Sequence, residues 1–279
     1  MTGAFQRSRA EIDDQEIELH LFLEAIYLKF HWDLRGYSRA SLQRRLAEAR
    51  VFFECSTLSG LQERLLHDPS VFPALTRFLT VPVSDLFREA PSFLTLRRDI
   101  VPLLRTYPSL RLWIAGCSTG EEAYSHAILL AEEGLLERTI VHATDINPDS
   151  LRVARAGAYG LDRLADFTEN HRQSGARQPL SDHYRIEHGA FVFHRELAHK
   201  IVFSDHSLAT DSVFSEMHLV SCRNVLIYFE RDLQNRALGL FKDSLCRRGF
   251  LCLGSPETPR FTDFESDFER IADQWYRRC

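Results

Sequence analysis

The sequence has no apolar run long enough to span a bilayer, no signal-peptide core and no excess of positive charge. The first absence excludes a membrane-spanning helix, which needs about 20 apolar residues. The N-terminal segment 1–18 is polar and acidic, so it lacks the apolar centre of a secretory signal. The formal net charge of −5 excludes the whole-protein basic field that holds a nucleic-acid backbone. We therefore expect no membrane insertion and no nucleic-acid partner.

Cysteine is also sparse. The six cysteines are scattered and contain no C-x-x-C pair. Such spacing indicates reduced thiols in a cytoplasmic protein, rather than disulfides or a zinc site, so no metal ligand set is predicted. The 279 residues, 44% of them hydrophobic and 20 of them Phe, suffice for one large domain or two smaller ones.

Residues 1–80 are predicted to form a small all-α domain. One apolar stripe recurs at three- and four-residue steps, which is typical of a helix packed on a core; it contains Leu19, Phe22, Leu23, Ile26 and Phe30. Ser41 is expected to cap a second helix. A third helical run stops at Pro69, and a short fourth continues to Phe78.

Residues 81–279 alternate between strand and helix patterns, which predicts an α/β, Rossmann-like domain with a mostly parallel sheet. Apolar strand segments lie at 111–116, 139–146, 200–208, 217–224 and 249–255, with a possible last strand at 273–279. Helices are expected at 120–134, from the Asn147-Pro148 start signal, and at 231–249. The pattern breaks at about 162–200, where a small antiparallel hairpin turning at Gly189 is predicted as an insertion.

The loop after the first strand of this domain, residues 116–122, has the sequence GCSTGEE. Its two glycines allow a sharp turn and a close approach of the backbone to a ligand. It fits neither the dinucleotide pattern G-x-G-x-x-G nor a P-loop, and its two acidic residues would repel phosphate. They suit a ligand with hydroxyls and a positive charge, such as an aminoacyl sulfonium nucleoside.

Two acidic residues near this loop each allow two interpretations. Glu122 either contacts the ligand or closes a capping box with Thr119. Asp145, at the end of the next strand, either accepts hydrogen bonds from both ribose hydroxyls or is a solvated helix-start acid, as Asp149 is expected to be. The glycine loop and the strand-end Asp together favour a nucleoside cofactor, without identifying the chemistry.

Four segments in order resemble the chemotaxis receptor glutamate methyltransferases, the CheR family. They are Phe-Arg-Glu at 87–89, GCSTGEEAYS at 116–125, ATDI at 143–146 and CRNVLIYF at 222–229. The resemblance runs from about residue 79 to the end of the chain. It implies a class I methyltransferase fold, with S-adenosylmethionine as methyl donor and S-adenosylhomocysteine as product.

The resemblance also implies roles for individual residues. Arg88 and Tyr228 are expected to be catalytic. The expected cofactor-binding residues are Ser84, Arg88, Gly116, Glu122, Asp145, Ser207, Leu208, Arg223 and Asn224. Methylation of a carboxylate is an in-line displacement that needs alignment and desolvation more than a strong base. The alternatives are an ion pair of Arg88 with Glu89 or Asp85, and a core position for Tyr228.

The sequence departs from the family pattern at several positions. Pro82 stands where the family has Asn and removes both a polar side chain and an N–H, whereas Ser84 and Ser207 keep a hydrogen-bonding group in place of Thr and Asn. Ala123 replaces a Pro, and Gly-Ser-Pro-Glu at 254–257 stands for Gly-His-Ser-Glu. These changes leave two rival functions open: a regulator with impaired catalysis, and a methyltransferase with a different carboxylate acceptor.

The family resemblance implies a methyl-accepting chemoreceptor as partner, through a Glu-rich helical region. Arginines of the second helix and the residues before it could dock such an acidic surface; they are Arg35, Arg39, Arg44, Arg45 and Arg50. The alternative is a solvated helix face with pairs such as Arg44–Glu48. In some family members the inserted hairpin adds a receptor C-terminal tether peptide as an extra strand.

Overall fold

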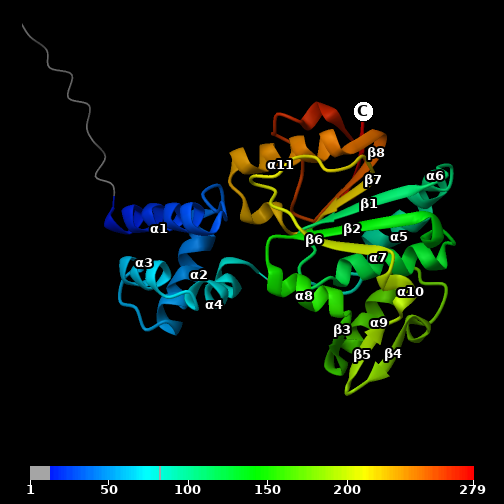
Figure 1. Cartoon of the computed structure of the whole chain (residues 1–279). Coiled ribbons are helices and arrows are strands. Elements are labelled where there is room, and N and C mark those ends of the chain that lie inside the picture. Colours follow the sequence, from blue (N-terminus) through cyan, green and yellow to red (C-terminus); the bar gives the residue numbers. More distant parts are fainter. Residues whose placement is uncertain (1–12, 82) are drawn as a thin grey trace, which may run out of the picture. The chain divides into compact units, whose positions relative to one another are not determined.

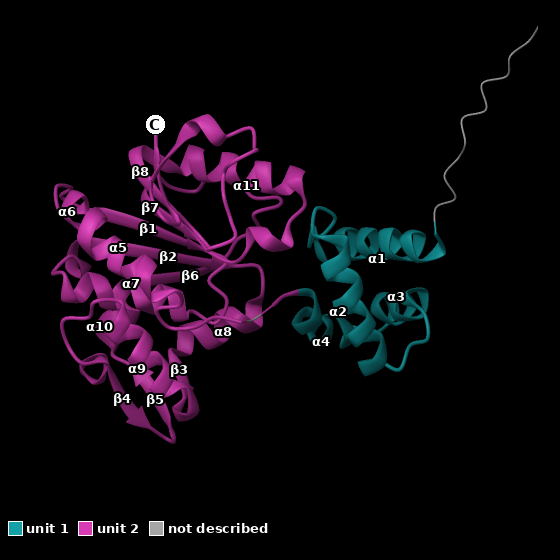
Figure 2. Ribbon diagram, turned by 180° about the vertical axis from the view of Figure 1, so that it is seen from behind, with its two compact units in different colours: residues 1–79 teal, residues 80–279 magenta. Residues whose placement is uncertain are grey.

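The computed structural model describes residues 13–81 and 83–279, and the chain divides into two compact units, residues 1–79 and 80–279 (Figure 2). Pro82, and with it the contact that this residue was expected to remove, lies outside the described residues. Within the described part of the chain, no helix is both long and apolar enough to cross a membrane. All six cysteines are free thiols, as expected.

Unit 1 is helical, with α1 (Asp14–Phe30), α2 (Arg39–Phe52), α3 (Leu58–His67) and α4 (Val71–Leu79). The predicted stripe of α1 is confirmed, because its first four members are buried in the core that the four helices share. The predicted cap at Ser41 is wrong: α2 begins at Arg39, two residues earlier. Ser41 therefore lies inside the helix, where its carbonyl accepts a hydrogen bond from Arg45 Nε at 3.1 Å.

Unit 2 is built on a seven-stranded sheet with the order β6-β2-β1-β7-β8-β10-β9 (Figure 1). The strands are β1 (Leu110–Ala115), β2 (Thr139–Asp145), β6 (Ile201–Asp205), β7 (Met217–Cys222), β8 (Leu245–Leu253), β9 (Phe268–Ala272) and β10 (Trp275–Arg278). The first five in sheet order run parallel, whereas β10 is antiparallel to both β8 and β9. The chain moves outward from β1 in opposite directions, so the strand order reverses between β1 and β7. Ligands of such sheets bind at this reversal, outside the carboxyl ends of the strands.

Helices cover both faces of this sheet. They are α5 (Ala90–Thr95), α6 (Val101–Leu104), α7 (Glu121–Glu132), α8 (Pro148–Ala156), α9 (Leu164–Gln173), α10 (Arg195–Ala198) and α11 (Arg231–Ser244). The helices α7 and α8 lie on one side and α11 on the other (Figure 1), as right-handed crossovers in opposite directions require. The predicted start of α8 is confirmed: Asn147 Oδ1 accepts hydrogen bonds from the backbone N–H groups of Asp149 and Ser150. The helix predicted at 231–249 instead ends at Ser244, and Leu245 already begins β8.

The insertion contains a second, three-stranded sheet with the order β3-β5-β4. The predicted hairpin is present, with β4 (Tyr184–Glu187) and β5 (Ala190–Phe193) joined at Gly189, whose φ of +77° suits glycine. Its third strand, β3 (Ala158–Gly160), was not predicted because three residues carry no readable alternation. Because β3 pairs with β5, this small sheet begins before residue 162.

Candidate active site at the strand ends

The glycine loop turns sharply off the end of β1. The backbone N–H groups of Gly116 and Cys117 both donate to the carbonyl of Thr144, at 2.8 and 2.9 Å. Gly116 and Gly120 have φ values of +74° and +95°. A Cβ atom on Gly116 would lie 2.5 Å from Val225 Cγ2, so glycine is required both for its backbone angle and for space. The start of the loop is therefore hydrogen-bonded to the end of β2 and packs against Val225, in the segment after β7.

Asp145 joins this loop to the end of β2. Its carboxylate accepts hydrogen bonds from the backbone N–H groups of Ser118 and Asn147, both at 2.8 Å. Burial raises the pKa of the Asp145 carboxyl above its ordinary value, although these backbone hydrogen bonds oppose the shift. Asp145 is thus a fixed strand-end acid, whereas Asp149 is the exposed helix-start acid, paired with Arg152 at 2.7 Å.

Glu122 does not close the capping box with Thr119. The N-cap of α7 is Gly120, and Thr119 Oγ1 donates instead to Glu121 Oε2 at 2.7 Å. Glu122 Oε1 accepts a hydrogen bond from Ser221 Oγ at 2.5 Å. Its other oxygen, Oε2, lies 3.8 Å from Arg223 Nη1. Glu122 therefore faces the end of β7, and the geometry favours the ligand-side interpretation over the cap.

Arg223 brings two of the recognised segments together. Its Nη2 donates to the carbonyl of Arg88 at 2.5 Å and to Glu89 Oε2 at 3.1 Å, and its guanidinium lies 5.2 Å from the ring centroid of Phe93. Its side chain is almost fully buried. Among the described residues its Nε finds no hydrogen-bond partner. A buried charged donor without a hydrogen-bond partner is costly. A ligand that offers an acceptor to Arg223 Nε would remove this cost.

The segment at 87–89 presents Arg88 on a strained turn. Phe87 and Glu89 have φ values of +51° and +56°, which non-glycine residues rarely adopt and which cost of order 1–3 kcal/mol each. The turn is fixed by Ser125, whose Oγ donates to the carbonyl of Glu121 at 2.7 Å and accepts from the Phe87 N–H at 2.8 Å. Strain of this kind persists at functional sites, where surrounding contacts hold it.

The Arg88 side chain forms neither of the ion pairs considered as alternatives. Asp85 pairs with Arg163 at 3.5 Å, and Glu89 pairs with Arg223. Among the ion pairs of residues 13–81 and 83–279, none involves Arg88. Its half-buried side chain lines a pocket whose other lining residues are Val83, Ser84, Asp85, Arg163, Asp166 and Phe167. A cation held in a pocket without a partner is available to a carboxylate substrate.

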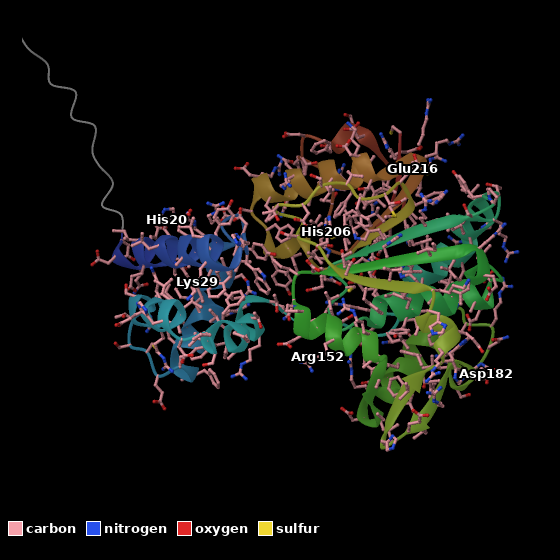
Figure 3. All side chains as sticks on the ribbon, viewed as in Figure 1. His20, Lys29, Arg152, Asp182, His206 and Glu216 are labelled. Carbon is pink, nitrogen blue, oxygen red and sulfur yellow. The ribbon has the colours of Figure 1, made fainter. Side chains whose placement is uncertain are left out.

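The remaining predicted residues lie on loops at the same edge. Tyr228 is in a short 3-10 turn (Leu226–Tyr228) after β7 and is half-buried, so it is not a core aromatic. Ser207 follows β6, where its Oγ accepts from the Ala209 N–H at 3.3 Å, and Leu208 is buried. His206, the first residue after β6, lies at this edge in Figure 3. Asp145 is thus the last residue of β2, and Gly116, Ser207 and Arg223 follow the ends of β1, β6 and β7, so the four residues lie at the carboxyl ends of four neighbouring parallel strands.

Glu257 is a residue of this region to which sequence reasoning gave no role. Its buried carboxylate accepts hydrogen bonds from four backbone N–H groups, those of Gly254 (2.6 Å), Val225 (2.8 Å), Asn224 (2.9 Å) and Ile227 (3.2 Å). Burial raises the pKa of the Glu257 carboxyl, and the four hydrogen bonds oppose that rise. Glu257 holds the left-handed turn at Asn224, where φ is +58°. The signals for it were its position four residues after the last parallel strand and its place at the end of the Gly-Ser-Pro-Glu segment, 254–257, that corresponds to the family's Gly-His-Ser-Glu.

The basic face predicted on α2 and the residues before it is wrong in one member, Arg45, and a second member, Arg35, is exposed but already ion-paired. Arg45 is buried, and its Nη1 donates to the carbonyl of Leu79 at 2.6 Å. Arg35 is neutralised by Glu24 at 3.0 Å and Asp33 at 2.8 Å. Arg39 and Arg44 are exposed on the helix surface.

Comparison with protein families gives two matches that together span most of the chain. Residues 17–80 match the all-alpha domain of CheR methyltransferase, and residues 82–276 match its SAM-binding domain. S-adenosylmethionine (SAM) is therefore the cofactor of the unit that carries the strand-end site, as expected. The predicted combination of a helical domain with a class I methyltransferase domain is also confirmed.

Individual relatives agree with these matches. Cher3 of Pseudomonas putida is 56% identical over 256 residues, which cover 92% of this chain and 94% of that protein. A chemotaxis protein methyltransferase of Listeria innocua is 30% identical over 248 residues, covering 88% and 92% of the two chains. Among solved structures, a glycopeptide N-methyltransferase complexed with SAM is 13% identical, with a TM-score of 0.36, over 61% of this chain and 50% of that one.

Proposed function

Because this chain belongs to the CheR methyltransferase family, we propose that it forms methyl esters on glutamate side chains in the cytoplasmic part of a chemoreceptor. The observation that carries this proposal is the contrast between Arg88 and Arg223, which are joined by the hydrogen bond from Arg223 Nη2 to the backbone carbonyl of Arg88. Arg223 is tied to Glu122 and Glu89, whereas Arg88 lines a pocket without an ion pair among the described residues. The terminal nitrogens of Arg223 are thus held by the protein, whereas the guanidinium of Arg88 is available to an acidic substrate.

The residues around the glycine loop fit the chemistry of the cofactor. Bound SAM would supply an electrophilic methyl group on a positively charged sulfur. Asp145 would accept hydrogen bonds from the ribose hydroxyls, since its carboxylate is already fixed by Ser118 and Asn147. Glu122 would complement the positive charge of the aminoacyl sulfonium part, and the unpartnered Nε of Arg223 would donate to its carboxylate. Ser84, Ser207, Leu208 and Asn224 would complete the cofactor site.

The acceptor carboxylate would be aligned by Arg88 and Tyr228. A glutamate is ionised near neutral pH, so no strong base is needed. Arg88 would hold one carboxylate oxygen through its guanidinium, which leaves the other oxygen to attack. Tyr228 would orient the carboxylate or line the methyl position. Alignment and exclusion of water together can supply roughly 7–11 kcal/mol of barrier reduction.

The partner that fits this chemistry is a methyl-accepting chemoreceptor, whose Glu-rich helices carry the substrate side chains. We place the reaction in the cytoplasm on the same grounds. The exposed arginines Arg39 and Arg44 of α2 would complement the acidic helices. The outer strand β4, with Arg185, Ile186 and Glu187 exposed, offers a free edge to a receptor C-terminal tether peptide.

The test is methyl transfer from tritiated SAM to a purified chemoreceptor cytoplasmic fragment. We expect label on the receptor that base releases as methanol, because glutamate methyl esters are labile to base. A receptor with its methylation-site glutamates changed to Ala is the matched control and should take up no label. Binding of S-adenosylhomocysteine without transfer would instead support a regulator with impaired catalysis. Transfer only to another acid would support a different acceptor.

A further inference from the structure

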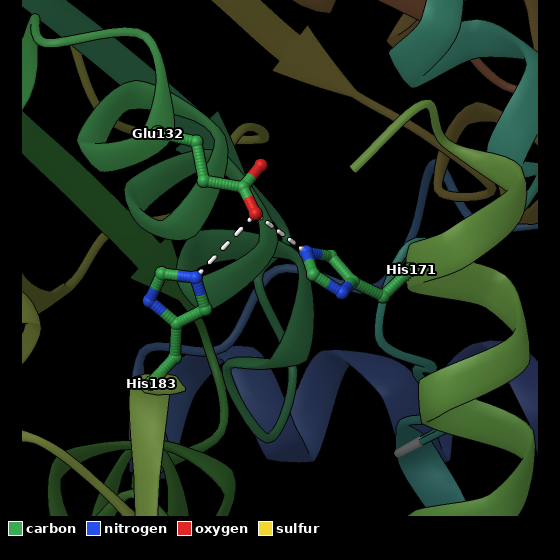
Figure 4. A group of neighbouring side chains, drawn as sticks. All are labelled: Glu132, His171 and His183. Atoms are coloured by element: carbon green, nitrogen blue, oxygen red, sulfur yellow. Dashed lines mark hydrogen bonds and ion pairs between the residues drawn. The ribbon is translucent and has the colours of Figure 1, made fainter. Parts of the chain in front are cut away.

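A second cluster of chemically active side chains lies at the far end of α7, away from the strand-end site. It consists of Glu132 from the last turn of α7, His171 from α9 and His183 from a short 3-10 helix (Leu180–His183) that leads into β4 (Figure 4). One ligand atom from each of the three residues lies within 4.8 Å of the other two. These residues are far apart in the sequence, so no spacing motif could have indicated them.

The three side chains are directed at one point. His171 Nε2 lies 3.0 Å from Glu132 Oε1, and His183 Nε2 lies 3.5 Å from the same oxygen. All three side chains are at least 92% buried. The contact from His183 does not have hydrogen-bond geometry, so its Nε2 has no partner within the described part of the chain. An unsatisfied buried nitrogen destabilises the fold, and a ligand at this point would remove that cost.

We propose that Glu132, His171 and His183 bind a divalent transition-metal ion of the zinc class. Two imidazole nitrogens and one carboxylate oxygen are a common ligand set for such ions, which often take a water as a further ligand. Ligands at roughly 2.0–2.2 Å from a tetrahedral ion lie ~3.3–3.6 Å apart. The observed separations of 3.0 and 3.5 Å from the carboxylate oxygen lie near this range, and all three ligand atoms lie within 4.8 Å of one another, so small side-chain shifts would bring them into coordinating positions.

The charges around the cluster allow a cation. Arg97 binds Glu132 through the other carboxylate oxygen, Oε2, so Oε1 stays directed at the two imidazoles. Arg97 also contacts Glu133, 3.3 Å away, whose carboxylate is buried as well. Glu133 is bound in addition by Arg105 and Arg177, at 2.8 and 3.1 Å, whereas Arg97 is the one arginine that contacts Glu132 among the described residues. Arg97 would act as the hydrogen-bonded support that ligating carboxylates usually have.

The cluster borders a cavity on the side of His183. His183 lines this cavity together with Ala131, Gly134, Leu136, Glu137, Asp182, His194, Glu196 and Leu197. Asp182 lies at the outer side of the insertion in Figure 3. Acidic and imidazole groups that line this cavity would attract a cation. The bound ion would join the insertion, through α9 and the 3-10 helix, to the same helix that carries Glu122 at its other end.

The experiment uses the full chain after treatment with chelator. Zn²⁺ is titrated by calorimetry, and the thermal midpoint is measured with and without the ion. We expect one equivalent of Zn²⁺ per chain, a higher midpoint, and loss of this binding in His183→Asn and His171→Asn. His188→Asn is the matched control, because His188 is exposed at the tip of the adjacent hairpin and should leave binding unchanged.

X-ray absorption of the zinc-loaded wild-type chain needs no variant and so does not depend on folding of a mutant. It should show two imidazole ligands at about 2.0–2.1 Å. No uptake of Zn²⁺ by the wild-type chain would overturn the proposal, as would uptake that both histidine variants retain. None of these measurements depends on methyl transfer, so the proposal and the methyltransferase function fail or hold separately.

Discussion

The two ends of α7 carry the same dipeptide but are arranged differently. Glu121-Glu122 opens the helix at the strand-end site, and Glu132-Glu133 closes it beneath the insertion. Acidic residues are favourable at a helix N-terminus and unfavourable at a C-terminus. The far end nevertheless keeps both carboxylates buried, because Arg97, Arg105 and Arg177 bind them. At the near end Glu121 is buried and paired with Arg163 at 2.6 Å, whereas Glu122 accepts a hydrogen bond from Ser221 and lies 3.8 Å from Arg223.

The buried arginines of the two ends show the same contrast. All three nitrogen positions of Arg97 have acceptors: Nε donates to the carbonyl of Ser174 at 3.1 Å, and the two terminal nitrogens bind Glu133 and Glu132. Arg223 has acceptors only for Nη2, and its Nε has none among the described residues. A buried polar network in which every donor has an acceptor stabilises a fold. A buried donor that lacks an acceptor is a candidate position for a ligand, an ion or a water. Variants at each end of α7 would therefore be expected to affect different properties: stability at the Arg97 end and ligand binding at the Arg223 end.

The largest effect on stability is expected at the C-terminal end of α7, where Arg97 binds Glu132 and Glu133. Arg97→Ala leaves two buried carboxylates without their shared cation, so we expect the free energy of unfolding to fall by about 3–5 kcal/mol. Urea denaturation measures this. Arg98→Ala is the matched control, since the neighbouring Arg98 is exposed and paired only with Asp99, and it should change stability by less than about 0.5 kcal/mol. Equal effects of the two variants would contradict the comparison.

The next largest effect is on cofactor affinity, and it should differ between Glu122 and Glu132, at opposite ends of α7. Glu122→Gln keeps the shape but removes the charge, so we expect S-adenosylhomocysteine to bind about 1.5–3 kcal/mol more weakly, roughly 10- to 100-fold. Glu132→Gln should lower stability and leave this affinity unchanged, because Glu132 lies at the other end of the helix. Calorimetric titration of both folded variants gives the answer. A similar loss of affinity in both would show that the two ends are not distinct.

A smaller effect with a defined pH dependence is expected at Glu89. Burial opposes ionisation of Glu89, but the Arg223 charge and hydrogen bonds from Arg223, Asn224 and Gln274 outweigh it and hold its pKa below the ordinary value of 4.5. A carboxylate with a lowered folded-state pKa stabilises the fold above pH 4.5, and the contribution is lost as the pH falls through the lowered pKa. Glu89→Gln should therefore cost about 1 kcal/mol at pH 7, allowing for its partial exposure.

The same comparison at low pH completes this test. Urea denaturation of the wild-type chain and Glu89→Gln should show a difference that shrinks steadily below pH 4.5. A difference that stays constant from pH 7 to pH 3.5 would mean that the Glu89 charge does not contribute.

The smallest effect is expected on the surface of unit 1. Arg44→Glu reverses one exposed charge on α2, so association with a chemoreceptor fragment should slow a few-fold at low salt and change little at high salt. Stopped-flow measurements would follow it. Arg45→Glu is the instructive contrast: because Arg45 is buried and bound to the carbonyl of Leu79, this change should disrupt the helical unit itself.

Much of this architecture could be predicted from local signals. The stripe of α1, the Asn147 cap and the hairpin at Gly189 each depend on a few neighbouring residues. The motifs around the glycine loop indicated the strand ends as the site, because parallel strands bring their carboxyl ends to one edge. Contacts made by short pieces of chain were missed, such as β3 and the start of β8 at Leu245.

The roles that could not be predicted depend on pairs far apart in the chain. Arg45 looked like an exposed helix residue, and only the position of Leu79 reveals why it is buried. Glu257 carries no side-chain pattern of its own, since its four partners are backbone N–H groups. Glu132 and His171 are 39 residues apart and meet only after the insertion folds back on α7. Tertiary folding, rather than spacing, sets all of these contacts.

The most direct test of the account is a paired measurement on Arg88→Ala. Calorimetry should show S-adenosylhomocysteine binding close to that of the wild-type chain, because the proposed contacts to the ribose and aminoacyl parts are made by Glu122, Asp145 and Arg223, and Arg88 is proposed to act mainly on the acceptor. Transfer of tritiated methyl groups to the chemoreceptor should fall by at least about 100-fold, as expected when a charged aligning group is removed. Unchanged transfer would contradict the assignment of Arg88, and with it the proposed division between donor binding and acceptor alignment.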